Sequence, residues 1–133
     1  MKQCKPLFQI TLPGRVIPKK NHRPTFVNQK TGRKFPGKSG NLQAYEDMAI
    51  IRLRTAWRGR QPIQGQLWVE CHHYQKDARW EPDLLGWQET LWDCLQAAGV
   101  IKNDRQIESS DKSRKHLRRG GEDEATITIY HYE

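Results

Sequence analysis

The sequence predicts a single α/β (α+β) domain, in which a small mixed β-sheet is flanked by two main helices. The length of 133 residues fits one domain of ordinary size. Segments with the two-residue apolar alternation of strands are interleaved with two segments that have the helical periodicity. Proline and glycine separate these segments. We therefore expect residues 1–133 to form one unit, with a strand, a hairpin, a helix, a strand, a helix and two final strands in that order.

The first half of the chain predicts a strand, a hairpin and a helix, each bounded by turn residues. The hairpin, or flexible flap, is expected where two short extended runs flank residues 28–33. The helix has an N-cap in Ser39–Asn41 and an apolar face that includes Leu42, Ala49 and Leu53. The expected elements are Leu7–Leu12, Thr25–Val27 with Lys34–Phe35, and Leu42–Trp57.

The second half predicts strands and one further helix. In the first strand, Val69 and Cys71 alternate with Glu70 and His72, so the two sets point to opposite faces. The helix has an apolar face and ends at Gly99, as a C-terminal glycine requires. The expected elements are the strand Gln66–Gln75, the helix Asp83–Ala98, a weak strand Arg105–His116, a turn Arg118–Glu122 and a final strand Ala125–Tyr130.

The charge distribution favours a polyanionic partner. Lysine and arginine number 23 against 15 acids, for a formal net charge of +8, and the first acid along the chain is Glu46. Each cation that neutralises a phosphate also releases condensed counterions, so an acid-free basic segment suits nucleic acid. The alternatives are a solvated surface or a basic protein of the ribosomal type.

The cysteines and the apolar segments indicate a cytoplasmic protein. Cys4, Cys71 and Cys94 are far apart and form no Cys-x-x-Cys, so we expect reduced thiols, with the last two in the core. No signal-peptide pattern and no apolar run of about 20 residues is found, and no nucleotide-binding loop. Adjacent His72 and His73 suggest zinc, but alternation sends them to opposite faces, so hydrogen-bonded strand histidines are expected instead.

Four carboxylates are gathered along the second helix and just beyond it. Glu89 and Asp93 are four residues apart and share a helix face, Asp83 precedes the helix, and Asp104 follows Gly99 by five residues. If they converge, such carboxylates could hold Mg²⁺, which prefers oxygen ligands and retains water. The alternatives are an N-cap at Asp83, solvent-facing acids within the helix, and turn chemistry at Asn103-Asp104.

This region resembles the RusA family of phage- and prophage-associated Holliday junction resolvases. The family helix opens on an Asp-x-Asp-Asn motif, carries a central Asp, and is followed by Ala-Gly and a turn ending in Asp. The opening strand and a loop with proline and asparagine, here Leu12–Gly14 and Pro18–Asn21, are also similar, so the resemblance covers nearly the whole chain. The matching segments of the helical region are Pro82–Leu85, Leu91–Leu95, Ala98–Ile101 and Asn103–Ile107.

The resemblance implies a homodimer in a bacterial or phage-infected cell that binds four-way DNA junctions and makes paired, Mg²⁺-dependent nicks in recombination and repair; Mn²⁺ is the alternative ion. It assigns catalytic roles to Asp83 and Asp104. The second family Asp is Leu85 here, the following Asn is Gly86, and the helical Lys is Glu89. We expect that Glu89, one helical turn after Leu85, replaces the lost carboxylate as a metal ligand. The expected metal ligands are Asp83, Glu89 and Asp104, and Asp93 is either a fourth ligand or an outer hydrogen-bond acceptor. The alternative is a degenerate member that binds junctions without cutting.

The resemblance also places the loop after the first strand near the active site. The expected DNA contacts there are Lys19, Lys20, Asn21 and Arg23. A second basic edge is expected at Lys112, Arg114 and Lys115, with a solvated charge run as the alternative. Trp80 is the tryptophan placed to stack on a splayed base. The candidates to stabilise transition-state charge are Lys19, Lys20 and Lys102.

Overall fold

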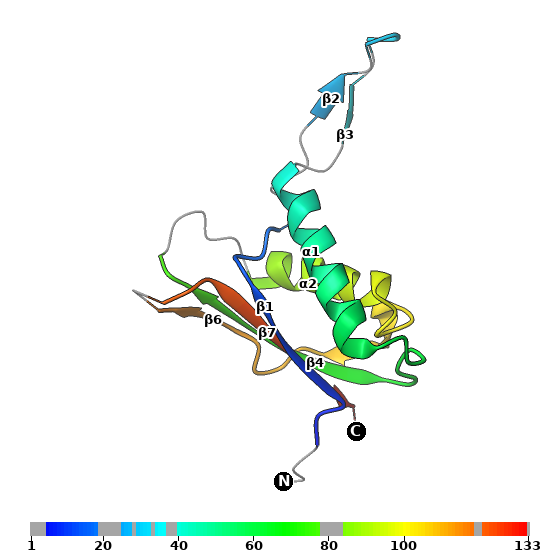
Figure 1. Cartoon of the computed structure of the whole chain (residues 1–133), viewed down its shortest axis with the longest axis vertical. Coiled ribbons are helices and arrows are strands. Elements are labelled where there is room, and N and C mark those ends of the chain that lie inside the picture. Colours follow the sequence, from blue (N-terminus) through cyan, green and yellow to red (C-terminus); the bar gives the residue numbers. More distant parts are fainter. Residues whose placement is uncertain are drawn as a thin grey trace.

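Two helices cover one face of a mixed β-sheet, and a separate hairpin projects beyond the start of the first helix (Figure 1). The computed structural model describes residues 5–18, 25–27, 29–32, 34–36, 40–77, 84–118 and 121–132. The helices are α1 (Gly40–Trp57) and α2 (Leu84–Ala97), with a short 3₁₀ helix η1 (Asp104–Gln106). The strands are β1 (Phe8–Pro13), β2 (Thr25–Val27), β3 (Lys34–Pro36), β4 (Leu67–Gln75), β5 (Ile107–Ser109), β6 (Arg114–Leu117) and β7 (Glu124–His131).

Strand β4 is the centre of the sheet. It pairs antiparallel with β7 over residues 67–74, and β7 pairs antiparallel with β1. On its other side β4 pairs in parallel with β5 and then with β6. The predicted fold class is therefore confirmed, with a mixed sheet of the kind expected.

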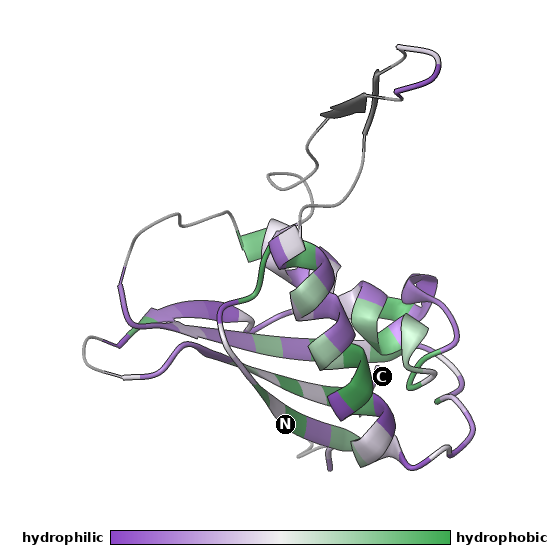
Figure 2. Cartoon of the chain, turned by 45° about the horizontal axis from the view of Figure 1, so that its top comes forward, coloured by the Kyte–Doolittle hydropathy of each residue, from purple (hydrophilic) through white to green (hydrophobic). Residues whose placement is uncertain are grey.

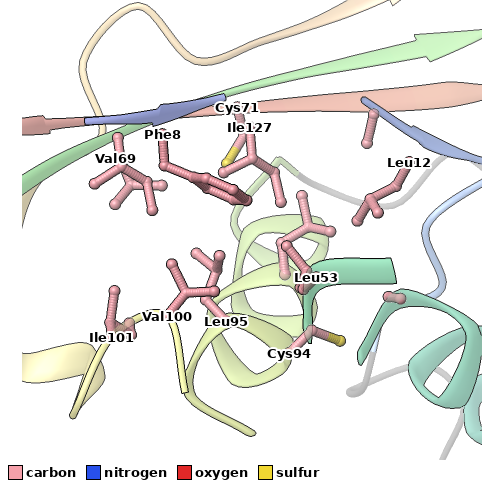
Figure 3. Packing of buried hydrophobic residues seen from close by; sticks show 14 of the residues in the cluster. Phe8, Leu12, Leu53, Val69, Cys71, Cys94, Leu95, Val100, Ile101 and Ile127 are labelled. Carbon is pink, nitrogen blue, oxygen red and sulfur yellow. The ribbon is translucent and has the colours of Figure 1, made fainter. Parts of the chain in front are cut away.

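One hydrophobic core lies between the sheet and the two helices (Figure 3). Alternate residues of β4, among them Leu67, Val69 and Cys71, are fully buried toward the helices. From α2, Leu91 and Leu95 are fully buried against them. Apolar residues thus line the inner face of the sheet, and hydrophobic and hydrophilic residues alternate along the strands (Figure 2). The predicted alternation of β4 is confirmed, and so are the predicted apolar faces of the helices, except that Glu46 is buried on that of α1.

Helix α2 ends where the sequence predicts. Gly99 has φ +77°, a left-handed conformation that costs glycine little and other residues more. The following N–H, of Val100, donates to the Leu95 carbonyl at 3.1 Å and closes the last turn. The chain is thereby turned back toward the sheet, and Val100 and Ile101 are buried.

The single weak strand expected over Arg105–His116 is wrong. A capping box starts η1 instead: the Asn103 side chain accepts from the Arg105 N–H at 2.8 Å, and the Gln106 side chain accepts from the Asn103 N–H at 3.0 Å. Two short strands follow, separated by residues 110–113. The Ser113 hydroxyl accepts from the Cys71 N–H at 2.9 Å, so a side chain replaces the β-ladder there.

The two described cysteines behave as the sequence predicts. Cys71 and Cys94 are buried and free. Burial, with a smaller contribution from Glu70, raises the pKa of the Cys71 thiol to about 12, so the thiol is not a nucleophile at neutral pH. Cys4 lies outside the described residues. Among the described segments, no helix has the length and apolarity to cross a bilayer.

Two leucines of α2 give a direct test of this packing. Leu91 is fully buried, whereas the side chain of Leu85 is 48% exposed. Leu91→Ala is expected to lower the free energy of unfolding by about 2–5 kcal/mol, because it leaves a cavity. Leu85→Ala, the matched control, is expected to change it by less than about 1 kcal/mol. Urea denaturation followed by circular dichroism measures both. Equal losses would contradict the orientation of α2.

Candidate metal centre on the second helix

One side of α2 carries carboxylates along its length. Leu85, Glu89 and Asp93 follow at intervals of four residues and Gln96 comes three later, so all four lie within about 80° around the helix axis. This acidic stripe (Leu85, Glu89, Asp93 and Gln96) faces away from the buried residues of α2. Glu89 and Asp93 are half-buried, and Gln96 is exposed. The predicted shared face of Glu89 and Asp93 is therefore confirmed.

Asp104 lies beside the C-terminal end of the stripe. Its backbone N–H donates to Oε1 of Gln96 at 3.2 Å, and its side chain is exposed. The cap formed by Asn103 and Gln106 holds η1 in this place, so the turn chemistry considered for Asn103 is present. Asp104 is therefore anchored at the last turn of α2.

The expected ligands are spread along the helix. Glu89 precedes Gln96 by seven residues, about 10 Å along the axis, whereas Asp93 precedes it by about 4.5 Å. Two oxygens on one Mg²⁺ lie at most about 4 Å apart, given ligand distances near 2.1 Å. Within the described residues, no three His, Cys, Asp or Glu side chains are grouped to hold a metal ion. The structure thus does not bring Glu89 and Asp104 together, and Asp93 is the stripe acid nearer to Asp104.

The predicted basic loop starts beside the stripe. Thr90, the neighbour of Glu89, is fully buried, and its hydroxyl donates to the Ile17 carbonyl at 2.7 Å. Lys19 follows Ile17 by two residues, a reach of about 7 Å at most. The predicted contacts Lys19, Lys20, Asn21 and Arg23 themselves lie outside the described residues. Ile17, two residues before Lys19, is nevertheless held at the second turn of α2.

Arg15 forms ion pairs with two carboxylates, one just after β4 and one just before β7, and the sequence alone did not predict them. We call this group the arginine clamp. Nη2 of Arg15 lies 3.0 Å from Oδ1 of Asp77 and 3.4 Å from Oδ1 of Asp123, and it also donates to the Asp77 carbonyl at 2.9 Å. Asp123 in turn accepts from the Lys76 N–H at 2.9 Å. These contacts hold together the ends of three segments: the one before residues 19–24, the one before residues 78–83, and the one before β7. Asp83 and Trp80 belong to residues 78–83, outside the described residues.

A buried histidine lies on the helix side of β4. His73 is 2% exposed and its ring stacks on Trp87 of α2, with centroids 4.9 Å apart. Neither ring nitrogen has a hydrogen-bond partner among the described residues, so the expectation of a hydrogen-bonded histidine is wrong here. Burial, with smaller contributions from His72, His116 and Lys115, lowers the pKa of His73 to about 3. The ring is therefore neutral at physiological pH.

His72 points to the other face of the sheet, as predicted. Its Nδ1 lies 2.8 Å from Nε2 of His116, and its Nε2 lies 3.4 Å from a carboxylate oxygen of Glu70. The zinc alternative, which would need His72 and His73 on the same side, does not fit this arrangement.

The predicted second basic edge is divided between two faces. His116 of β6 contacts His72 and Tyr74 on the face away from the helices. Arg114 shares that face by alternation, whereas Lys115 points to the helix side and contributes to the lowered pKa of His73. Lys112 lies over the Trp68 ring, also away from the helices.

Comparison with known proteins adds no relative: no protein-family model matches the chain, and no curated protein matches it. The resemblance to the RusA family therefore rests on the residues quoted above.

The depressed pKa of His73 predicts a loss of stability in mild acid. The unfolded state takes up a proton near the ordinary histidine pKa of about 6.5, whereas the folded state does not until pH falls to about 3. Stability is therefore full above about pH 6.5 and falls as the pH decreases toward 3. Between pH 7.5 and pH 5 this group alone is expected to lower the free energy of unfolding by about 2 kcal/mol.

His73→Gln is expected to remove this part of the pH dependence, measured as the difference between urea denaturation at pH 7.5 and at pH 5. Because each variant is compared with itself, a general loss of packing cancels. His131→Gln, at an exposed position, is the matched control and should retain the wild-type difference. An unchanged pH difference in His73→Gln would contradict the assignment.

Proposed function

We propose that the protein is a Mg²⁺-dependent endodeoxyribonuclease that acts as a homodimer on four-way DNA junctions and resolves them by paired nicks. The observation that carries the proposal is the hydrogen bond from Thr90 to the Ile17 carbonyl. It fixes the start of the basic loop beside the carboxylates of α2, so that cations for the phosphate and acids for a metal ion arise from adjacent segments. The resemblance to the RusA family supports the same reaction.

The donor set of the stripe fits Mg²⁺. This ion is commonly held by only one or two carboxylates, with waters and substrate phosphates completing its shell. Glu89 and Asp93 are half-buried oxygen donors one helical turn apart on one face of α2, a spacing at which side chains are neighbours. Asp83 directly precedes the first residue of α2 and is the further ligand in this proposal.

Each group of this chain then has a distinct task. Bound Mg²⁺ supplies polarisation of the phosphate and a water of lowered pKa. Glu89 and Asp93 would hold the ion, and Lys19 or Lys20 would bind the phosphate. Asp104 and the exposed Lys102 lie at the other end of α2, where they can contact the backbone of the same strand or the active site of the second protomer. Two protomers related by a twofold axis would match the symmetry that paired nicks require.

A second candidate function is junction binding without cleavage. It is favoured by Leu85, a 48% exposed leucine at the position of the second family Asp, and by the lack of a three-ligand group among the described residues. In that case the basic loop binds phosphates, and the remaining carboxylates hold Mg²⁺ too weakly for catalysis. The two candidates differ in one measurable property, which is cleavage in the presence of a divalent ion.

Glu89→Gln tests whether Glu89, one of the two acids of the stripe, acts in catalysis. The substrate is a synthetic four-way junction, incubated with the protein with and without Mg²⁺ and analysed on denaturing gels. The wild type is expected to make symmetric nicks, and Glu89→Gln to reduce their rate at least about 100-fold, since even outer partners of metal ligands contribute about 10–100-fold. Junction binding in EDTA should be unchanged, because the charge that contacts phosphate is retained. Asp83→Asn should likewise lose cutting and keep junction binding. Unchanged cutting by Glu89→Gln would show that Glu89 is not a metal ligand.

Leu85→Asp tests whether a carboxylate has been lost at the family position. Because Leu85 is exposed, the new acid is expected to cause little loss of stability and to increase Mg²⁺-dependent cutting, with half-saturation at a lower Mg²⁺ concentration. Leu85→Asn is the matched control, with the same size and no charge, and should not show the gain. Tight junction binding with no cutting by either the wild type or Leu85→Asp, in Mg²⁺ or Mn²⁺, would leave the binding function as the correct one.

A further inference from the structure

The face of the sheet away from the helices carries a row of aromatic and imidazole side chains. Because alternate residues of β4 enter the core, Trp68, His72 and Tyr74 point to the opposite face. Both helices lie on the other side of the sheet (Figure 2). We call this side the open face and define it by Trp68, Tyr74, Lys112, Arg114, His116, Arg118 and Tyr130.

The rings form two stacks along β4. Trp68 stacks on Tyr130 of β7, with centroids 4.6 Å apart and planes at 25°. Tyr74 stacks on His116 of β6 at 4.6 Å and 16°, and His116 is also 5.0 Å from His72. All of these rings are half-buried rather than covered. The open face therefore presents π-systems at two places along one strand.

Cations lie over the rings. Nζ of Lys112 is 5.5 Å from the centroid of Trp68, and the guanidinium carbon of Arg118 is 4.3 Å from that of Tyr74. Arg118 is paired with Glu124 at 2.6 Å. Lys112 and Arg114 are exposed, and neither has a carboxylate partner among the described residues. These two charges are available to an anion.

The position of Lys112 is built into the edge of the sheet. Between the pairs Trp68↔Ser109 and His72↔Arg114, three residues of β4 face four residues of the other chain segment, which is a bulge. Trp68 Nε1 donates to the Asp111 carbonyl at 2.9 Å and fastens this bulge over the ring. Lys112 adopts φ +69°, a left-handed conformation that is uncommon outside glycine. The backbone thus holds a cation beside the indole.

We infer that the open face binds single-stranded nucleic acid, with bases packing against the exposed parts of the ring stacks Trp68–Tyr130 and Tyr74–His116 and phosphates contacting Lys112 and Arg114. Aromatic rings interleaved with cations suit single-stranded nucleic acid, because each unpaired base offers a π-face and each phosphodiester linkage a negative charge. A duplex hides its base faces. A second copy of this chain, docked through the same face, would bring Lys112 and Arg114 against the same cations. The carboxylates of this face are already engaged, Glu124 with Arg118 and Glu70 beside His72. This inference goes beyond the proposed function and does not rest on it, since strand binding needs no metal.

The test is binding of a fluorescent thymidine oligonucleotide of about 20 residues, measured by anisotropy in EDTA at several salt concentrations. Lys112→Gln/Arg114→Gln is compared with Arg52→Gln/Arg58→Gln, exposed positions of and beside α1 on the helix side. Both variants lower the net charge of +8 by two. Loss of two phosphate contacts should reduce the slope of log K against log salt by about 1.4 and weaken binding about 25-fold at 0.1 M salt. The control should keep the wild-type slope.

Three results would overturn the inference: no binding by the wild type, equal weakening in the two double variants, or equal competition by a duplex of the same length. A dimer in sedimentation that dissociates only in Lys112→Gln/Arg114→Gln would also overturn it, since the open face would then join two copies. The two proposals fail separately. A wild type that cuts junctions but ignores the oligonucleotide refutes only the open-face site, and one that binds the strand in EDTA without cutting junctions refutes only the nuclease.

Discussion

The two-residue alternation of β4 is the constraint on which the rest of the structure depends. This strand is paired on both sides, with the Ser113 hydroxyl in place of a strand at the Cys71 N–H, so its side chains determine what each face of the sheet does. One set of residues, including Val69 and Cys71, supports the two helices. The other set, including Trp68 and Tyr74, forms the open face. A shift of one residue in register would exchange the two sets, placing His72 in the core and Cys71 in solvent.

The sequence was sufficient for the parts of the fold that depend on local patterns. The boundaries of α2 follow from its apolar periodicity and from Gly99, whose left-handed backbone ends the helix. The same is true of β4 and of the hairpin. The chain from Asp104 to Leu117 was misread because its structure depends on side chains bonding to backbone far away: Gln106 caps η1 and donates to the Ile63 carbonyl, and Ser113 takes the place of a strand opposite Cys71. Side-chain hydrogen bonds that take the place of backbone pairing leave no periodic pattern in the sequence.

In the candidate site too, some features follow from local sequence patterns and others depend on contacts between distant segments. That Glu89 and Asp93 share a face of α2 follows from spacing alone. The place of Asp104 does not, because it depends on how far the chain travels after Gly99 before η1 binds Gln96. Arg15, which clamps Asp77 and Asp123, was missed for a different reason: a single arginine after a turn has no distinguishing pattern. Likewise Glu46 lies buried on the face of α1 that was expected to be apolar, and only the folded structure reveals it.

The two proposed surfaces lie on opposite sides of the sheet, and the physical chemistry of each suits a different form of the same polymer. On the helix side, the carboxylates of α2 would recognise a phosphodiester through a metal ion, as the proposed function requires, without regard to the base. On the open face, the rings would recognise unstacked bases, which a duplex does not offer. A junction exposes both forms, because strands exchange at its centre and bases there can unstack. A protein with both surfaces would therefore bind most tightly where duplex arms meet an unpaired segment. The strand would then pass the edge of the sheet at β6, where Lys115 points toward the helices and Arg114 toward the open face.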